Sequence, residues 1–262
     1  MIRSPLGLRL PPNPSLRDQI LEAAKLGAKG VVLDAIGDIA PERLSDSGRR
    51  DLRHLLRSTE LSLIALSLPT RRPFDSVDQL DDRLRRADNA FALAYDLGTR
   101  LVLVRVGPLP PESDAPRRET FVANVAELGR RADHRGVRLA IETGTEPGAT
   151  LRALLDGLKT PGLAASIDPA SLLQNRIDPV AATRELSDWV AHAYASDTAT
   201  AGAGLSAANP RSFAVSPSDL DWAEYLGALE EINYRGFLTI WPDPSRPIGP
   251  QFAALAGRLN RF

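Results

Sequence analysis

Residues 137–168, VRLAIETGTEPGATLRALLDGLKTPGLAASID, contain two short and mainly apolar runs on either side of an amphipathic stretch. The runs VRLAIE and LAASID each end in a carboxylate, Glu142 and Asp168. Runs of this length that are apolar almost throughout are typical of parallel strands buried on both faces. The segment therefore predicts a strand, a helix and a second parallel strand, with one carboxylate at the carboxyl end of each strand.

The same alternation extends over the whole chain, at a spacing of roughly thirty residues. The predicted strands are residues 6–10, 30–35, 61–68, 101–106, 137–142, 163–168, 189–195 and 236–241. Polar caps and glycines delimit the helices between them, as with Ser15 and Gly27 around the first helix and Gly98 after a long arginine-rich one. Eight such units predict a single α/β domain over residues 1–262, a (β/α)8 TIM barrel. A doubly wound open sheet is the alternative, but no G-x-G-x-x-G motif follows the first strand.

Composition excludes several classes of function. The 262 residues are 43% hydrophobic and 25% charged, with a net charge of −1, so no basic surface for nucleic acid is indicated. There is no cysteine to form a disulfide or a thiolate metal cluster, and only three histidines. No run approaches the ~20 apolar residues of a membrane-spanning helix. We expect a soluble cytoplasmic protein with no nucleic-acid and no membrane partner, able to form an oligomer.

In a barrel of this kind, functional groups gather at the carboxyl ends of the strands. Glu142 and Asp168, on neighbouring strands roughly 5 Å apart, are close enough to share a divalent cation or a proton. Arg105, one strand away, is a candidate for binding an anionic substrate or for neutralising the two carboxylates. The structural alternative is that each of these groups only caps a strand or forms an ion pair. The polar stretch 198–217 is either a substrate loop or a plain surface loop.

At these residues the chain resembles the xylose-isomerase-like TIM barrels, which include sugar-phosphate isomerases and epimerases. The resemblance is carried by GAKGVVLDA (27–35), IETGTE (141–146), IDPASLL (167–173), HAYASD (192–197) and DLDWAEYLGALEEINYRGFLTIW (219–241). It implies a divalent metal bound by Glu on strand five, Asp on strand six, His within H-x-H-x-x-D on strand seven and Glu on strand eight. Glu142 and Asp168 fall on the first two of these positions.

The other two metal positions depart from the family pattern. Tyr194 stands where the ligand histidine is expected, and Trp241 stands where the glutamate is expected. Neither side chain is a good ligand for a hard divalent ion. We therefore expect a partly lost metal site with either no cofactor or a weakly bound Mn²⁺, Mg²⁺, Co²⁺ or Zn²⁺.

Two functions follow as hypotheses. The first is a sugar or sugar-phosphate isomerase or epimerase in which Glu142 and Asp168 are catalytic and transfer a proton next to a carbonyl. A small sugar-like molecule would contact a predicted binding set: Arg105, His192, Tyr194, Asp197 and Trp241. The second is a non-catalytic barrel that binds a small polyol or a protein partner in the former active-site mouth, with aromatic rings supplying stacking area.

Overall fold

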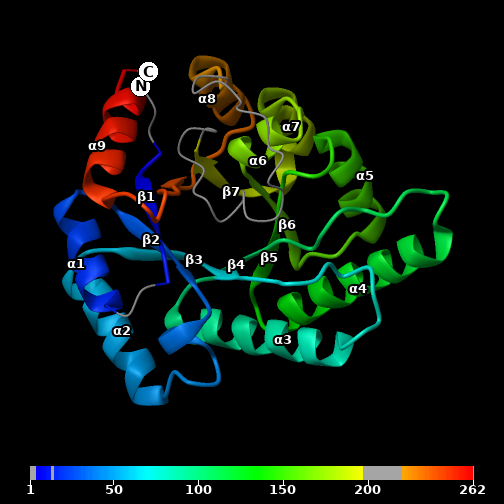
Figure 1. Ribbon diagram of the computed structural model, residues 1–262, viewed down its shortest axis with the longest axis horizontal. Coiled ribbons are helices and arrows are strands. Elements are labelled where there is room, and N and C mark those ends of the chain that lie inside the picture. The colour runs from blue at the N-terminus through cyan, green and yellow to red at the C-terminus, as the bar shows by residue number, and fades with distance from the viewer. Residues whose placement is uncertain (1–3, 13–14, 197–219, 262) are drawn as a thin grey trace.

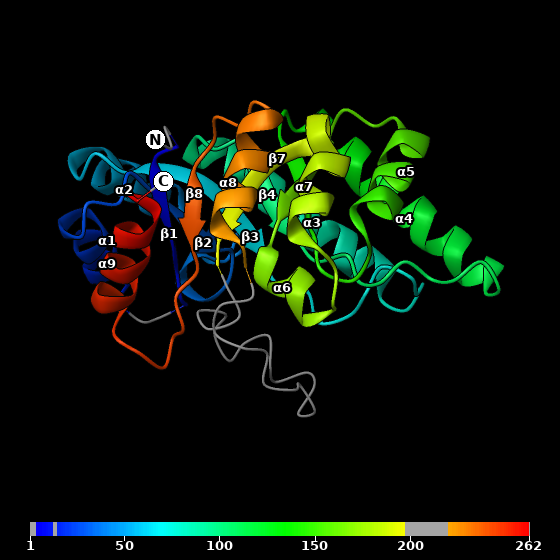
Figure 2. The same cartoon turned by 90° about the horizontal axis from the view of Figure 1, so that it is seen from above.

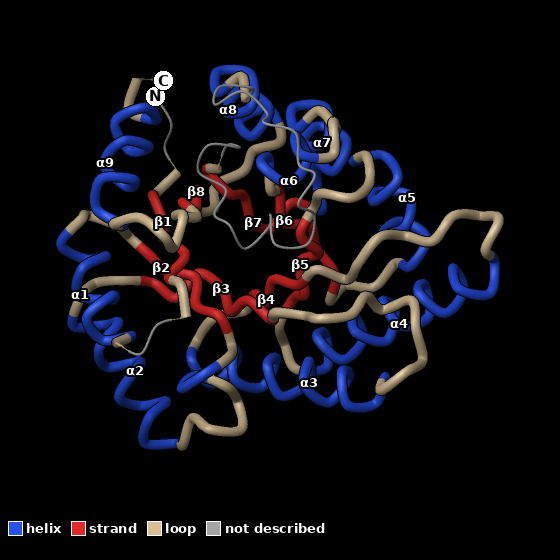
Figure 3. Tube along the Cα trace, in the orientation of Figure 1, coloured by secondary structure: helices blue, strands red, loops and turns tan. Residues whose placement is uncertain are grey.

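A closed parallel barrel forms the centre of the protein. The computed structural model describes residues 4–12, 15–196 and 220–261, and its eight strands pair in chain order with β8 returning to β1. The strands are β1 (Leu6–Leu10), β2 (Gly30–Asp34), β3 (Ser62–Leu68), β4 (Leu101–Val104), β5 (Arg138–Glu142), β6 (Leu163–Ile167), β7 (Val190–Ala195) and β8 (Leu238–Ile240). Figure 3 shows this ring of strands enclosed by helices. The predicted (β/α)8 barrel is confirmed, and the open-sheet alternative is wrong.

The helices surround the barrel on its outside (Figures 1 and 2). In the described part of the chain they are α1 (Leu16–Lys25), α2 (Asp46–Ser58), α3 (Leu80–Leu97), α4 (Ala115–His134), α5 (Gly148–Leu158), α6 (Pro169–Gln174), α7 (Pro179–Leu186), α8 (Trp222–Glu231) and α9 (Ile248–Leu259). Two short 3₁₀ turns, Gly37–Ile39 and Ser187–Trp189, precede α2 and β7. Strand β6 is followed by two helices, α6 and α7, a local addition to the one-helix-per-strand pattern. Within the described ranges no helix is long and apolar enough to cross a membrane.

Helix boundaries follow the local signals in the sequence. Ser15 lies at the N-cap position of α1, and Gly27 follows the helix with φ of +87°. Helix α3 ends at Gly98, whose φ of +92° lies in the left-handed region that glycine adopts without a Cβ penalty. At these two glycines the helices α1 and α3 end, and the chain turns toward the next strand.

The apolar core has two parts. The larger part lies between the strands and the helices, and a smaller one fills the barrel interior. Small residues make room inside the barrel: a Cβ on Gly7 would overlap Cδ1 of Ile64, so Ile64 occupies the space that a larger residue on β1 would take. The interior cluster comprises Val32, Ala65, Leu103, Ala140, Ala164 and Tyr194. Polar side chains lie next to this cluster and form the candidate site.

Candidate functional site

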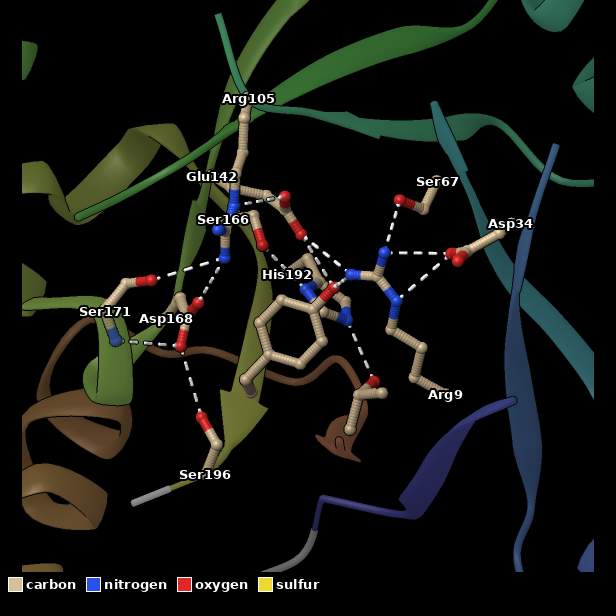
Figure 4. A network of polar contacts seen from close by, with 12 residues as sticks. Arg9, Asp34, Ser67, Arg105, Glu142, Ser166, Asp168, Ser171, His192 and Ser196 are labelled. Carbon is tan, nitrogen blue, oxygen red and sulfur yellow. Dashed lines mark hydrogen bonds and ion pairs between the residues drawn. The ribbon is translucent and has the colours of Figure 1, made fainter. Parts of the chain in front are cut away.

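A network of charged and polar side chains joins the strands at the barrel mouth (Figure 4). Each strand contributes through the side chains that alternate toward the barrel interior. The charged members are Arg9 from β1, Asp34 from β2, Arg105 from the segment after β4, Glu142 from β5 and Asp168 from the end of β6. Two guanidinium groups and three carboxylates therefore meet in one small volume.

Arg9 is the central cation of this network. Its Nη1 donates to Oε1 of Glu142 at 3.2 Å and to the hydroxyl of Tyr194 at 2.7 Å. Its Nη2 donates to Oδ1 of Asp34 at 2.9 Å and to Oγ of Ser67 at 2.7 Å. The side chain is 8% exposed. Burial alone would lower the pKa of Arg9, but Tyr194, Glu142 and Asp34 raise it, so the group is a permanent cation.

Arg105 is the second cation, and it bridges the two carboxylates that the sequence singles out. Its Nε donates to Oε2 of Glu142 at 3.2 Å, and its Nη2 donates to Oδ2 of Asp168 at 3.1 Å. A further contact joins Nη2 to Oγ of Ser171 at 3.3 Å. Unlike Arg9, this side chain is 37% exposed. Arg105 is therefore the member of the network that presents positive charge toward solvent.

Glu142 is held ionised by its surroundings. Oε1 accepts hydrogen bonds from Arg9 and from the hydroxyl of Tyr194, the latter at 2.8 Å, while Oε2 accepts from Arg105. Burial would raise the pKa of this carboxyl, but Arg9 and Arg105 bring it below the ordinary value. The side chain is 4% exposed.

Asp168 has a structural partner as well as an electrostatic one. Its Oδ1 accepts from the backbone N–H of Ser171 at 3.3 Å, which makes Asp168 the N-cap of α6, and from Oγ of Ser196 at 3.2 Å. The carboxyl is fully buried, and burial raises its pKa in spite of Arg105. Burial thus pushes the pKa of Asp168 upward while the arginines pull that of Glu142 downward.

Two aromatic rings complete the site. The ring of Tyr194 is fully buried, and its hydroxyl links Arg9 to Glu142 as acceptor and donor at once. The half-buried ring of Trp241 follows β8 and lies 3.8 Å from the guanidinium carbon of Arg9, measured to the ring centroid. Arg105 lies 5.5 Å from the same ring. Both rings therefore stabilise the arginines through cation–π and hydrogen-bonding contacts.

His192 packs edge-on against Tyr194, with the ring centroids 4.6 Å apart, and forms its hydrogen bonds with hydroxyl groups. Its Nδ1 is 2.8 Å from Oγ of Ser166, its Nε2 is 2.9 Å from Oγ1 of Thr239, and the ring is fully buried. Burial lowers the pKa of His192 to about 3. The imidazole is therefore neutral at physiological pH and serves as a hydrogen-bonded part of the interior.

This burial predicts a pH dependence of stability. An unfolded chain binds a proton at His192 below about pH 6.5, whereas the folded chain binds it only near pH 3. Stability is therefore lost as the pH falls from about 7, by roughly 2 kcal/mol at pH 5 for a difference of this sign and size. Urea unfolding of the wild type and of His192→Gln at pH 7 and pH 5 should show a smaller acid loss in the variant. The exposed His54→Gln serves as control, and parallel profiles for wild type and His192→Gln would contradict the assignment.

The donor set does not suit a divalent cation. A cation between Glu142 and Asp168 would lie against the guanidinium of Arg105, which already contacts both carboxylates. Tyr194 and Trp241 supply no strong ligand for a hard ion. The described residues include no group of three or more His, Cys, Asp or Glu side chains able to hold a metal. Over this part of the chain, positive charge at the carboxylates comes from arginine.

The structure brings some of the predicted site residues together, but not all of them. Arg105, Glu142 and Asp168 come together as an ion-paired cluster, with Tyr194 and Trp241 beside them. His192 is fully buried and lies between the hydroxyl groups of Ser166 and Thr239. Asp197, and the stretch 198–217, lie outside the described residues.

Sequence reasoning missed Arg9, the group with the largest number of polar contacts in the network. The available signal was a single arginine inside the apolar strand LGLRL, where alternation places it on the same face as Gly7. An arginine between two buried leucines must find carboxylate partners inside the barrel. Their identity depends on closure of the barrel and is not visible in the strand itself.

A pocket of about 290 Å³ opens beside Arg105 and Glu142. Its polar lining comes from the loop after β5 and from α6, including Thr143, Glu146 and Asn175. Apolar walls are formed by side chains such as Phe121 and Leu151. The pocket is large enough for a small polyhydroxylated molecule, with the partly exposed side chain of Arg105 at one side.

Comparisons with known proteins place the chain in a family. The family model described as xylose isomerase-like TIM barrel matches residues 20–258. A search of curated proteins found no match. Among solved structures, a xylose isomerase domain protein from Planctomyces limnophilus has a TM-score of 0.79 and 18% identity, covering 99% of this chain and 96% of the other. D-psicose 3-epimerase from Clostridium cellulolyticum H10, in complex with D-tagatose, has a TM-score of 0.77 and 14% identity, covering 98% of each chain. The fold, the order of its strands and the extent of the match show that this chain belongs to the xylose isomerase-like TIM barrel family.

Proposed function

We propose that this protein is a sugar isomerase or epimerase-like barrel that works without a divalent metal, because arginine side chains supply the positive charge at its carboxylates. The observation that carries the proposal is the position of Glu142, which is ionised between Arg9 and Arg105 and lines the pocket at the mouth. Membership of a family with sugar epimerases among its structural neighbours supports a small sugar-like ligand. In this proposal the metal site of the family is degenerate.

The chemistry needs a base and a group that stabilises negative charge. Glu142 accepts the proton from the carbon next to the substrate carbonyl, which leaves an enediolate. The exposed guanidinium of Arg105 donates hydrogen bonds to the enediolate oxygen, in the role of an oxyanion-stabilising group. Transfer of the proton from Glu142 to the former carbonyl carbon, with the hydroxyl proton passing to the enediolate oxygen, gives an isomer. Delivery of a solvent proton to the opposite face of the original carbon, while Glu142 gives its proton to solvent, gives an epimer.

Asp168 has a supporting role in this scheme. Its Oδ2 contacts Arg105 and its Oδ1 caps α6, so the carboxylate fixes the guanidinium relative to the helix. Arg9 and Tyr194 fix the other oxygen of Glu142 in the same way. The base and the cation are therefore preorganised before the substrate binds.

Turnover without metal is the direct test. Chelator-treated protein is incubated in D2O with a panel of aldoses, ketoses and their phosphates, and proton NMR follows exchange at the carbon next to the carbonyl. We expect enzyme-dependent deuterium incorporation that is unchanged by a chelator. Exchange that requires added metal would contradict the role given to the arginines.

Metal binding is tested separately by thermal unfolding. A ligand at one hundred times its Kd adds about 2.7 kcal/mol of stability, a shift of several degrees for a chain of this length. We expect no saturable shift on titration of the chelator-treated protein with Mn²⁺, Mg²⁺, Co²⁺ or Zn²⁺. A saturable shift that disappears in Glu142→Ala would show instead that a metal does bind at these carboxylates.

A second candidate is a non-catalytic barrel that binds a small polyol at the same mouth. Each oxygen of Glu142 and Asp168 already accepts a hydrogen bond from a protein group. This favours the second candidate, because a carboxylate held in this way is a weaker base. Calorimetry separates the two candidates. Saturable binding of a sugar with no hydrogen exchange in D2O would support the binding protein.

A further inference from the structure

A second pocket lies between strand β3 and helix α3. Its volume is about 310 Å³. The lining residues are Leu68, Pro69, Thr70, Arg71, Arg72, Phe74, Gln79, Arg83 and Arg86. Four of these are arginines, and no acidic residue of the described chain is among them. The pocket is therefore a concentrated region of positive charge in a protein whose net charge is −1.

The four arginines differ in whether a nearby carboxylate compensates their positive charge. Arg72 forms an ion pair with Asp78 at the surface. Arg83 donates hydrogen bonds from both of its terminal nitrogens to backbone carbonyls of the β3–α3 loop. Because these acceptors are neutral, no negative charge compensates the guanidinium. Arg71 and Arg86 are exposed and have no hydrogen-bond or ion-pair partner among the described residues. At least three positive charges thus remain available to a ligand.

Nearby carboxylates do not cancel this charge. Asp75 is held by Arg117, and Asp82, in the first turn of α3, is 2.7 Å from Arg85. Asp81 in the same turn is exposed and does not line the pocket. Of the acidic groups around the loop, Asp78 thus compensates Arg72, while Asp75 and Asp82 are paired with arginines that do not line the pocket.

The pocket is formed by the end of β3, the loop that follows it and one face of α3. Arg83 and Arg86 are three residues apart, which places them on one face of α3, and Gln79 is the N-cap residue of that helix. The ring of Phe74 lies under Arg83, with the guanidinium carbon 5.2 Å from its centroid. Gln79 has φ of +51°, a conformation that non-glycine residues rarely adopt. Arg83 and Arg86 thus project from one face of α3, whereas Arg71 and Arg72 come from the loop that follows β3.

The arginine pocket adjoins the candidate site. The hydroxyl of Thr70, which lines the pocket, donates to the backbone carbonyl of Arg105 at 2.7 Å. The N–H of Phe74 donates to the carbonyl of Val106 at 2.8 Å. The β3–α3 loop is therefore hydrogen-bonded to the backbone of Arg105 and Val106, and the side chain of Arg105 lines the first pocket.

We propose that this arginine pocket binds the phosphate group of a small phosphorylated ligand. A phosphate offers three acceptor oxygens and nearly two negative charges, and planar guanidinium groups bind such oxygens in bidentate fashion. The assignment of the rest of the ligand as a sugar in the adjoining pocket rests on the proposed function. The pair of pockets then selects a sugar phosphate over the free sugar.

Titration of the full-length protein with inorganic phosphate tests the site alone. The double variant Arg71→Gln/Arg86→Gln removes the two unpaired charges, and both side chains are exposed, so folding should be retained. The matched control is Arg50→Gln/Arg57→Gln, which removes two exposed arginines from α2. We expect calorimetry to show saturable phosphate binding by the wild type and the control, and at least a tenfold weaker affinity in the pocket variant. Equal affinity in all three proteins would overturn the proposal.

Further arms identify the ligand class. Acetate in place of phosphate should bind far more weakly, and tighter binding of acetate would reject phosphate in favour of a carboxylate ligand. A sugar phosphate should bind at least tenfold more tightly than the matching free sugar, and the advantage should vanish in the pocket variant. Glu142→Gln should retain inorganic phosphate binding, so failure of the proposed catalysis leaves this result unaffected. Absence of phosphate binding by the wild type rejects the pocket without bearing on proton transfer.

Discussion

Replacing Arg9 by methionine is expected to lower the free energy of unfolding by about 3–5 kcal/mol, the range for removing one partner from a buried ion pair. The variant keeps most of the side-chain volume but leaves Asp34 without its cation, in a site where the carboxyl side chain is 11% exposed. Glu142 keeps Arg105 and Tyr194 but loses the contact to Oε1 from Arg9. The loss is measured from urea unfolding curves of the wild type and variant at pH 8.

The stability lost in Arg9→Met should be smaller at lower pH. Without Arg9 the pKa of Asp34 and of Glu142 rises, because burial then acts with less compensation from positive charge. Protonation of these carboxyls at lower pH relieves the unpaired charge, so the stability difference from wild type should shrink between pH 8 and pH 5.

The control is an arginine with similar bidentate contacts at the surface. Arg135 contacts Asp88 through Nε at 3.0 Å and Nη2 at 2.6 Å, with side-chain exposures of 43% and 25%. Arg135→Met should lose at most about 1 kcal/mol, as surface ion pairs do. If Arg9→Met loses no more than Arg135→Met, the buried network is not a determinant of stability.

Glu142→Gln is expected to reduce proton exchange on the substrate by about a hundred- to ten-thousand-fold, the range for loss of a general acid or base. The amide keeps the shape of the side chain but does not accept a proton at neutral pH. Exchange is followed by proton NMR in D2O, and circular dichroism and the melting temperature report whether the variant is folded.

A matched variant separates catalysis from damage to the network. Asp34→Asn makes the same carboxyl-to-amide change in another partner of Arg9, but Asp34 does not line the pocket that contains Glu142 and Arg105. It should be destabilised like Glu142→Gln and yet retain most of the exchange activity. Equal loss of activity in both variants would mean that the network is needed only for folding, and unchanged activity in Glu142→Gln would remove it as the base.

Much of the fold was determined by local sequence pattern. Short apolar runs, the glycines after helices and the regular repeat of strand and helix predicted all eight strands, because burial on both faces and left-handed turn positions leave a direct signature in residue type. The carboxylates at the ends of β5 and β6 were found in the same way, since strand ends can be read from the end of an apolar run. The place of Trp241 after β8 followed likewise.

The pairing of charges was decided only by the tertiary structure. Arg9 is 133 residues from Glu142 and 185 from Tyr194 in the chain, and closure of β8 on β1 brings them within hydrogen-bonding distance. Whether Glu142 and Asp168 share a metal, a proton or a guanidinium depends on which side chains enter the barrel mouth from other strands. The sequence alone determined where the acidic groups lie along the barrel, and folding determined their counter-ions, because electrostatic energy depends on distances that only the closed barrel sets.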